Sequence, residues 1–118
     1  MTDRPPRSID SILRMAVDSV GAVELLLLLR STGAEPQSVE RLCAALASPA
    51  SWTEQRLDAL RRAGLVARDD GGDWRYAPSN PRLASGVDDL AAAWRRDSTS
   101  VRRWIFTPRD RTRRPRTA

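Results

Sequence analysis

One stretch, Ser51 to Tyr76, constrains the fold of this chain more than any other part of its sequence. Its first half carries a stripe of side chains at helical spacing, which are Thr53, Leu57 and Leu60. Ser51, with Glu54 three residues later, is the pattern of an N-terminal capping box, and Gly64 stands where a left-handed C-terminal cap is needed. We therefore expect a helix over residues 52–63 whose stripe faces the core.

A short β-hairpin is predicted directly after this helix. Residues 65–68 read as an extended run, and two aspartates followed by two glycines at 69–72 supply turn residues. Trp74 and Tyr76 project from one face of the return strand, and Arg75 projects from the other. Aromatic side chains in this position either stack on a ligand or partner or pack on the core, and we favour the core.

Helices are predicted on both sides of this stretch. Ser8 is expected to cap a helix from Ile9, which either breaks near Ser19 or continues with a kink into residues 22–30. The segment 22–30 is apolar nearly all round, so it should be buried. A third helix capped by Ser38 has an apolar stripe made of Val39, Leu42, Cys43 and Leu46.

A long helix over residues 82–106 is expected to follow a turn at 78–81. Its apolar residues approximate a seven-residue repeat that Asp97 and Ser98 interrupt. The repeat consists of Leu83, Val87, Leu90, Trp94, Val101 and Ile105. This seam is longer than a small domain should cover by itself, so we expect a dimer interface here; the alternative is pairing with the first helix inside one chain, which would bury both faces.

The order of a short helix, a tight turn, a second helix ending in Gly-Leu-Val and a hairpin resembles the winged helix-turn-helix of bacterial transcriptional regulators, in particular the MarR-like group. The residues that carry the likeness are 38–46, 48–50 and 51–76. The resemblance implies a mainly α fold with a small β-hairpin, a winged helix-turn-helix with flanking N- and C-terminal helices, over residues 8–106. It also implies a homodimer made by those flanking helices.

Composition excludes several classes of function. The chain has one cysteine and no histidine, which removes disulfide frameworks, ordinary zinc sites and Ser-His-Asp triads, so we expect no enzyme, no metal and no cofactor. Cys43 is expected to be a core thiol rather than a redox sensor. No apolar run is long enough to span a membrane, and we expect a cytoplasmic protein.

Positive charge is concentrated at one end of the sequence. Residues 107–118 hold five arginines and one aspartate, a net charge of +4, which leaves +1 of the total of +5 for residues 1–106. We expect residues 1–7 to be a disordered leader and residues 107–118 to be a disordered tail that either attracts phosphates or merely aids solubility.

The favoured function is a non-enzymatic transcriptional regulator that reads double-stranded DNA with the helix 52–63. Its expected DNA contacts are Ser51, Trp52, Gln55, Arg56, Arg62, Arg68, Arg75, Arg109, Arg111, Arg113, Arg114 and Arg116. The aspartates of the hairpin turn are unfavourable for DNA binding, because carboxylates repel phosphates. The alternative is a winged-helix module whose acidic hairpin and exposed Trp52 bind a protein partner; a small-molecule effector is undetermined.

Overall fold

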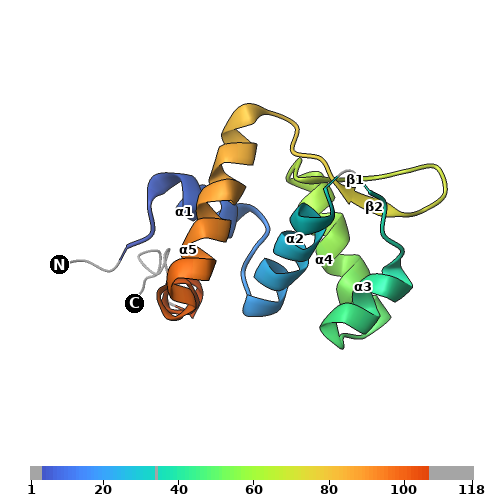
Figure 1. Cartoon of the computed structure of the whole chain (residues 1–118), viewed down its shortest axis with the longest axis horizontal. Coiled ribbons are helices and arrows are strands. Elements are labelled where there is room, and N and C mark those ends of the chain that lie inside the picture. The colour runs from blue at the N-terminus through green and yellow to red at the C-terminus, as the bar shows by residue number, and fades with distance from the viewer. Residues whose placement is uncertain (1–3, 34, 107–118) are drawn as a thin grey trace, which may run out of the picture.

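In the computed structural model, which describes residues 4–33 and 35–106, the described chain forms five helices and one antiparallel hairpin (Figure 1). The elements are α1 (Arg7–Met15), α2 (Val20–Thr32), α3 (Val39–Leu46), α4 (Ala50–Arg62), β1 (Val66–Arg68), β2 (Trp74–Tyr76) and α5 (Pro81–Phe106). The predicted mainly α fold with a small β-hairpin is therefore confirmed. Among these helices, none combines the length and the apolarity that a membrane crossing requires.

Two helices begin earlier than their serines suggest. Pro6 precedes α1 and Pro49 precedes α4, each with an extended ψ, and neither helix start has a side-chain cap. The predicted caps Ser8 and Ser51, and with them the capping box to Glu54, are wrong, since both serines lie inside the first turn. Proline supplies a φ already suited to a helix start, so the chain turns helical immediately after it.

Two other predicted helix starts agree with the structure. The chain breaks between α1 and α2, and the Ser19 hydroxyl accepts a hydrogen bond from the amide of Ala22. Ser38 caps α3 in the same way through the amide of Arg41. These capped starts satisfy amides that would otherwise lack partners in the first turn.

Gly64 ends α4 in the left-handed conformation, with φ +83°. The amide of Leu65 donates to the carbonyl of Leu60, and the amide of Gly64 donates to the carbonyl of Arg61. This pair of hydrogen bonds is a Schellman cap. The chain is thereby turned directly into β1. A Cβ added at position 64 would also lie 2.6 Å from the Ser79 hydroxyl oxygen, which is too close for any side chain.

The hairpin pairs Val66 with Tyr76 and Arg68 with Trp74. Gln37, in the segment before α3, exchanges two backbone hydrogen bonds with Trp74, at 2.7 and 2.8 Å. This short bridge fastens the hairpin to the start of α3. Trp74 is buried and Tyr76 packs against the core, so the preference for core packing of both aromatic residues is confirmed.

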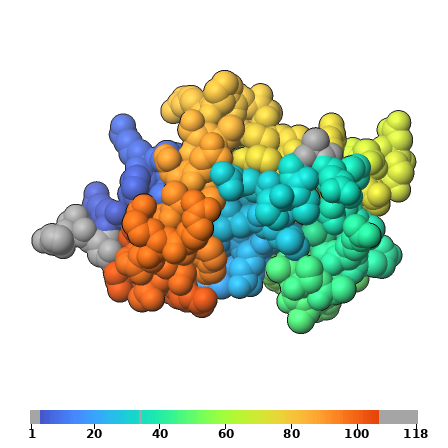
Figure 2. Space-filling model, viewed as in Figure 1, coloured from blue at the N-terminus to red at the C-terminus, as the bar shows by residue number. Residues whose placement is uncertain are grey.

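The first and last helices pack on each other inside the chain, and α2 lies in the centre, as Figures 1 and 2 show. Gly86 permits the close approach of α5 to α1, because a Cβ there would lie 2.9 Å from the Ser8 carbonyl oxygen. The Ser8 hydroxyl donates to the Asp89 carboxylate nearby, at 2.7 Å. This pairing forms one half of a core that continues through α2 to α3, α4 and the hairpin.

The long helix α5 is interrupted at Asp97, whose φ of −158° and ψ of 81° are not helical. The Asp97 carboxylate accepts hydrogen bonds from the amide and the hydroxyl of Ser100, so it caps the segment that follows. The sequence placed the interruption of the apolar repeat at Asp97 and Ser98 within one continuous helix, so the bend of the backbone at Asp97 was not predicted. Beyond the bend the helix changes direction, as its last turns in Figure 1 show.

Candidate nucleic-acid interface

Helix α4 buries one stripe and exposes another. Thr53, Leu57 and Leu60 are fully buried, as predicted. On the opposite side, Ser51, Gln55 and Arg62 are exposed. These three side chains form the exposed face of α4, and they are the predicted contact residues of this helix that reach solvent freely.

Two predicted contact residues of α4 are instead held by the chain itself. Arg56 is only 26% exposed, and its guanidinium lies 3.1 Å from the Asp18 carboxylate in the connection between α1 and α2. The indole of Trp52 is half-buried and covers Gly21, where a Cβ would lie 2.9 Å from the ring. Both side chains dock α4 onto the start of α2, so the expectation that Trp52 is simply exposed is wrong.

Acidic side chains neutralise part of the C-terminal half of α4. Asp58 lies 2.6 Å from Arg61 and 3.3 Å from Arg62, and the hydrogen bond from Arg61 is the main cause that lowers the pKa of the Asp58 carboxyl. Arg62 nevertheless remains 69% exposed. An exposed ion pair of this kind contributes little to stability and breaks easily, so Arg62 can exchange Asp58 for a phosphate.

The hairpin turn is built by one of its own aspartates. The Asp69 carboxylate accepts hydrogen bonds from the amides of Gly71 and Asp73, at 3.0 and 2.9 Å. Gly72 adopts φ +89°, which favours glycine. Asp69 is therefore a structural residue of the turn, while Asp70 is exposed at its tip.

The two predicted arginines of the hairpin lie in different settings. Arg68 lies along the hairpin, with its guanidinium carbon 5.4 Å from the centroid of the Trp74 ring and its Nε 3.4 Å from the Gly72 carbonyl oxygen. Arg75 is half-buried on the opposite face of β2. Neither residue makes the tip of the hairpin basic.

A shallow groove of about 440 Å³ lies between α3, α4 and the hairpin. It is lined by Val39, Glu54, Asp58, Arg61, Arg68 and Trp74. Two carboxylates and two guanidinium groups share this lining, so the groove carries no net charge that would select an anion or a cation.

The turn between α3 and α4 is organised around the buried hydroxyl of Thr53. This hydroxyl donates to the Pro49 carbonyl at 2.9 Å, lies 2.7 Å from the Ser48 hydroxyl, and accepts from the Cys43 thiol at 3.4 Å. Cys43 is half-buried rather than fully buried. Its thiol is engaged between the two helices, in keeping with a packing role.

The predicted dimer seam lies inside the single chain. Val87, Leu90 and Val101 are fully buried, Ile105 is nearly so, and Leu83 and Trp94 pack against the same core at partial exposure. The seam needs no second copy of the chain to cover it, because α1 and α2 already do so. The predicted dimer interface on this seam is therefore wrong. The homodimer itself stays a prediction, without this seam as its surface.

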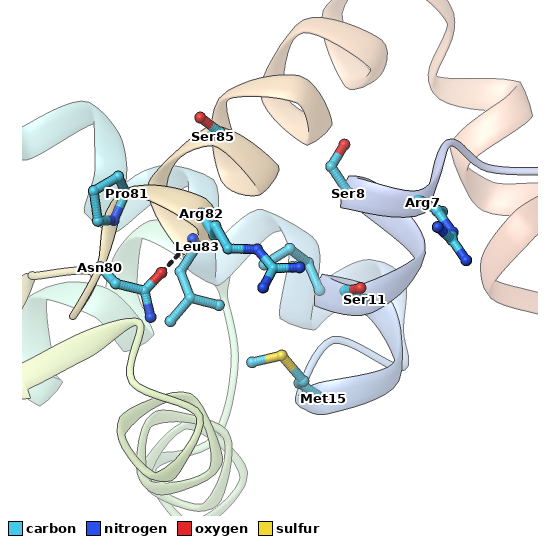
Figure 3. Close-up of a pocket in the computed structure, with 10 residues that line it drawn as sticks. Arg7, Ser8, Ser11, Met15, Asn80, Pro81, Arg82, Leu83 and Ser85 are labelled. Atoms are coloured by element: carbon cyan, nitrogen blue, oxygen red, sulfur yellow. Dashed lines mark hydrogen bonds between the residues drawn. The ribbon is translucent and has the colours of Figure 1, made fainter.

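A second groove, of about 900 Å³, separates α1 from the start of α5 (Figure 3). Its rim carries Arg7, Arg82 and three serines, and Ile12, Met15 and Leu83 contribute apolar surface. None of its lining residues belongs to α4 or the hairpin, so it is separate from the candidate interface. In the part of the chain that the structure describes, no group of three or more histidine, cysteine, aspartate or glutamate residues is arranged to hold a metal ion.

The remaining predicted contacts, Arg109, Arg111, Arg113, Arg114 and Arg116, lie outside the described residues, as do residues 1–3 of the predicted leader. Residues 4–6 precede α1, and Arg7, which was assigned to the leader, is the first residue of that helix. The sequence analysis overlooked four exposed arginines of α5, which are Arg95, Arg96, Arg102 and Arg103. The sequence does contain a pattern that could have indicated them: an Arg-Arg pair occurs twice, seven residues apart. Residues seven apart lie on nearly the same face of a helix. Comparison with models of protein families and with curated proteins finds no match to this chain.

Proposed function

We propose that this protein is a winged helix-turn-helix regulator that binds double-stranded DNA, with α4 in the major groove and no chemistry of its own. The observation that carries the proposal is the exposed face of α4. This helix follows α3 across a three-residue turn and is docked by Leu57 and Leu60. Ser51, Gln55 and Arg62 are left facing solvent.

The chemistry of these three residues suits duplex DNA. Gln55 can accept from and donate to the edge of an adenine at once, which is the commonest way a glutamine reads a base. Arg62, nearly two helical turns further along, suits a phosphate contact. Arg56 is assigned a docking role instead of a reading role, since its guanidinium pairs with Asp18.

In vitro selection from a library of random duplexes tests this function. We expect enrichment of a defined sequence, and a two-fold symmetric one would support the homodimer that we include in the proposal. Gln55→Ala should reduce the preference for that sequence by roughly 1–3 kcal/mol, because one bidentate base contact is lost. Ser85→Ala, on the exposed side of α5, is the control and should leave the preference unchanged.

A second function remains in competition because of the hairpin. Asp69, Asp70 and Asp73 surround its turn, and the arginines on either side do not project from the tip. An acidic hairpin fits a basic segment of a protein partner better than it fits phosphates. Failure to enrich any sequence at low salt, together with binding of a basic peptide that Asp70→Asn abolishes, would favour this reading over DNA.

A further inference from the structure

The end of α5 carries positive charge that belongs neither to the exposed face of α4 nor to the hairpin. Four arginines lie there, Arg95, Arg96, Arg102 and Arg103, and we call them the α5 basic end. All four are exposed. Asp97 is the one carboxylate between residues 95 and 106, so this short segment has a net charge of +3.

The bend at Asp97 brings one of these arginines, Arg102, back beside the helix segment that precedes it. In a straight helix Trp94 and Arg102 would be separated by about 12 Å of rise. Across the bend, the guanidinium carbon of Arg102 lies 5.3 Å from the centroid of the Trp94 ring. Stacking on the indole holds Arg102 beside the segment that carries Arg95 and Arg96.

Acidic side chains pair with several other arginines of the described chain. Asp10, Asp18, Asp58 and Asp88 form ion pairs with Arg14, Arg56, Arg61, Arg62 and Arg30. Asp97 instead accepts hydrogen bonds from Ser100. Among the described residues, Arg95 and Arg96 take part in no ion pair, so their charge remains available to an external anion.

The charge is also polarised along the molecule. The longest dimension is 48 Å, and Figure 1 shows the hairpin near one end of it and the final turns of α5 near the other, beside the start of α1. One end therefore carries Asp69, Asp70 and Asp73, and the other carries the α5 basic end. A rod of uniform negative charge would be attracted at the second end and not at the first.

We propose that the α5 basic end grips the phosphate backbone of duplex DNA, without reading sequence, and supplies the attraction that the acidic hairpin cannot. This inference rests on the proposed DNA-binding function and adds a surface to it. Duplex DNA presents one negative charge per about 1.7 Å of its axis, so a cluster of arginines meets several phosphates at once. Guanidinium groups bind phosphate oxygens with two parallel hydrogen bonds.

The test compares two double variants of the full chain that remove the same charge. Arg95→Gln/Arg96→Gln alters the α5 basic end, and Arg14→Gln/Arg82→Gln, on α1 and at the start of α5, is the matched control. Binding to a fluorescein-labelled random duplex of about 20 base pairs is followed by anisotropy between 50 and 200 mM NaCl, after thermal melting has shown that all proteins are folded. Each lost phosphate contact reduces the slope of the logarithm of the binding constant against the logarithm of the salt concentration by about 0.9.

The expected result for Arg95→Gln/Arg96→Gln is a salt slope flatter by roughly 2 per chain, so the wild type should lose about tenfold more affinity than this variant between 50 and 200 mM NaCl. The sequence ranking set by α4 should not change. The control should keep the wild-type slope. Equal slopes for wild type and the α5 variant, or equal losses in both variants, would overturn this inference and leave the proposed function intact. A wild-type chain that binds no duplex at 50 mM but binds polyglutamate through these arginines would overturn both, and would assign the α5 basic end to an acidic protein.

Discussion

Single residues decide how α4 is held. Trp52, Thr53 and Arg56 are adjacent or nearly adjacent in sequence, yet each reaches a different neighbour: the backbone at Gly21, the turn before α4, and Asp18. Two of them would be judged free contact residues from a helical wheel alone. Their partners lie more than thirty positions earlier in the chain, so only the packing of α4 on α2 reveals their role.

The buried hydroxyl of Thr53 gives a prediction at this scale. Thr53→Val keeps the shape of the side chain but removes the bonds to the Pro49 carbonyl and the Ser48 hydroxyl. We expect a loss of roughly 1–3 kcal/mol in the free energy of unfolding, because buried polar groups are left without partners. Chemical denaturation measures this loss.

Thr53→Ser is the matched control for this substitution. It keeps the hydroxyl and loses one methyl group, which costs about 1 kcal/mol. A Thr53→Val protein as stable as the wild type would show that the hydroxyl network does not stabilise the turn between α3 and α4.

At the scale of elements, a local cap decides where a helix bends. Asp97 lies in extended backbone and caps the segment that begins after it, so the bend is specified by one side chain and its bonds to Ser100. The hydroxyl and amide of Ser100 are the main causes that lower the pKa of the Asp97 carboxyl. The same bend brings Arg102 of the α5 basic end beside Trp94.

A pH titration tests this cap. The pKa of Asp97 is lowered in the folded state, so the cap stabilises the fold when the pH is above the ordinary pKa of an aspartate. This stabilisation is lost as the pH falls through the lowered pKa of the folded state. Ser100→Ala should therefore raise the pKa of the Asp97 carboxyl toward its ordinary value, as measured by NMR. Asp58 serves as the internal control, because the pKa of its carboxyl is lowered by Arg61 and not by Ser100. It should titrate as in the wild type.

At the scale of the whole molecule, the pairing of α1 with α5 completes the core. The seam of α5 is buried without a second chain, and Leu90 at its centre is fully buried. Positive and negative charge lie near opposite ends of the longest dimension. The molecule therefore presents its charged ends, rather than its apolar seam, to possible partners.

Replacement of Leu90 tests the place of this seam. Leu90→Ala should lower the free energy of unfolding by roughly 2–5 kcal/mol, as truncation of a buried leucine leaves a cavity. The mass measured by sedimentation equilibrium should equal that of the wild type, whether the wild type is a monomer or a dimer. Conversion of a wild-type dimer into a stably folded Leu90→Ala monomer would contradict the intramolecular assignment; Ser85→Ala is the exposed control.

Local patterns in the sequence determined the order of the elements and left open whether the first two helices are separate or one kinked helix. Apolar spacing placed the helices, Gly64 ended α4, and Ser38 marked a real helix start, because caps and turns depend on a few neighbouring residues. Of the two alternatives at Ser19, the structure has the break. The starts at Pro6 and Pro49 were missed, since a serine nearby offered a competing local signal. These are errors within one turn of a helix.

Only the tertiary structure decided what each exposed-looking side chain touches. Trp52 covers Gly21, Arg56 pairs with Asp18, and the seam around Leu90 is covered within the chain. Each of these contacts joins residues far apart in sequence, and a periodic pattern shows that a face is apolar or polar without showing what covers it. The exposed helix that holds the candidate site was thus predicted from sequence, while its exposed residues, Ser51, Gln55 and Arg62, were selected by packing.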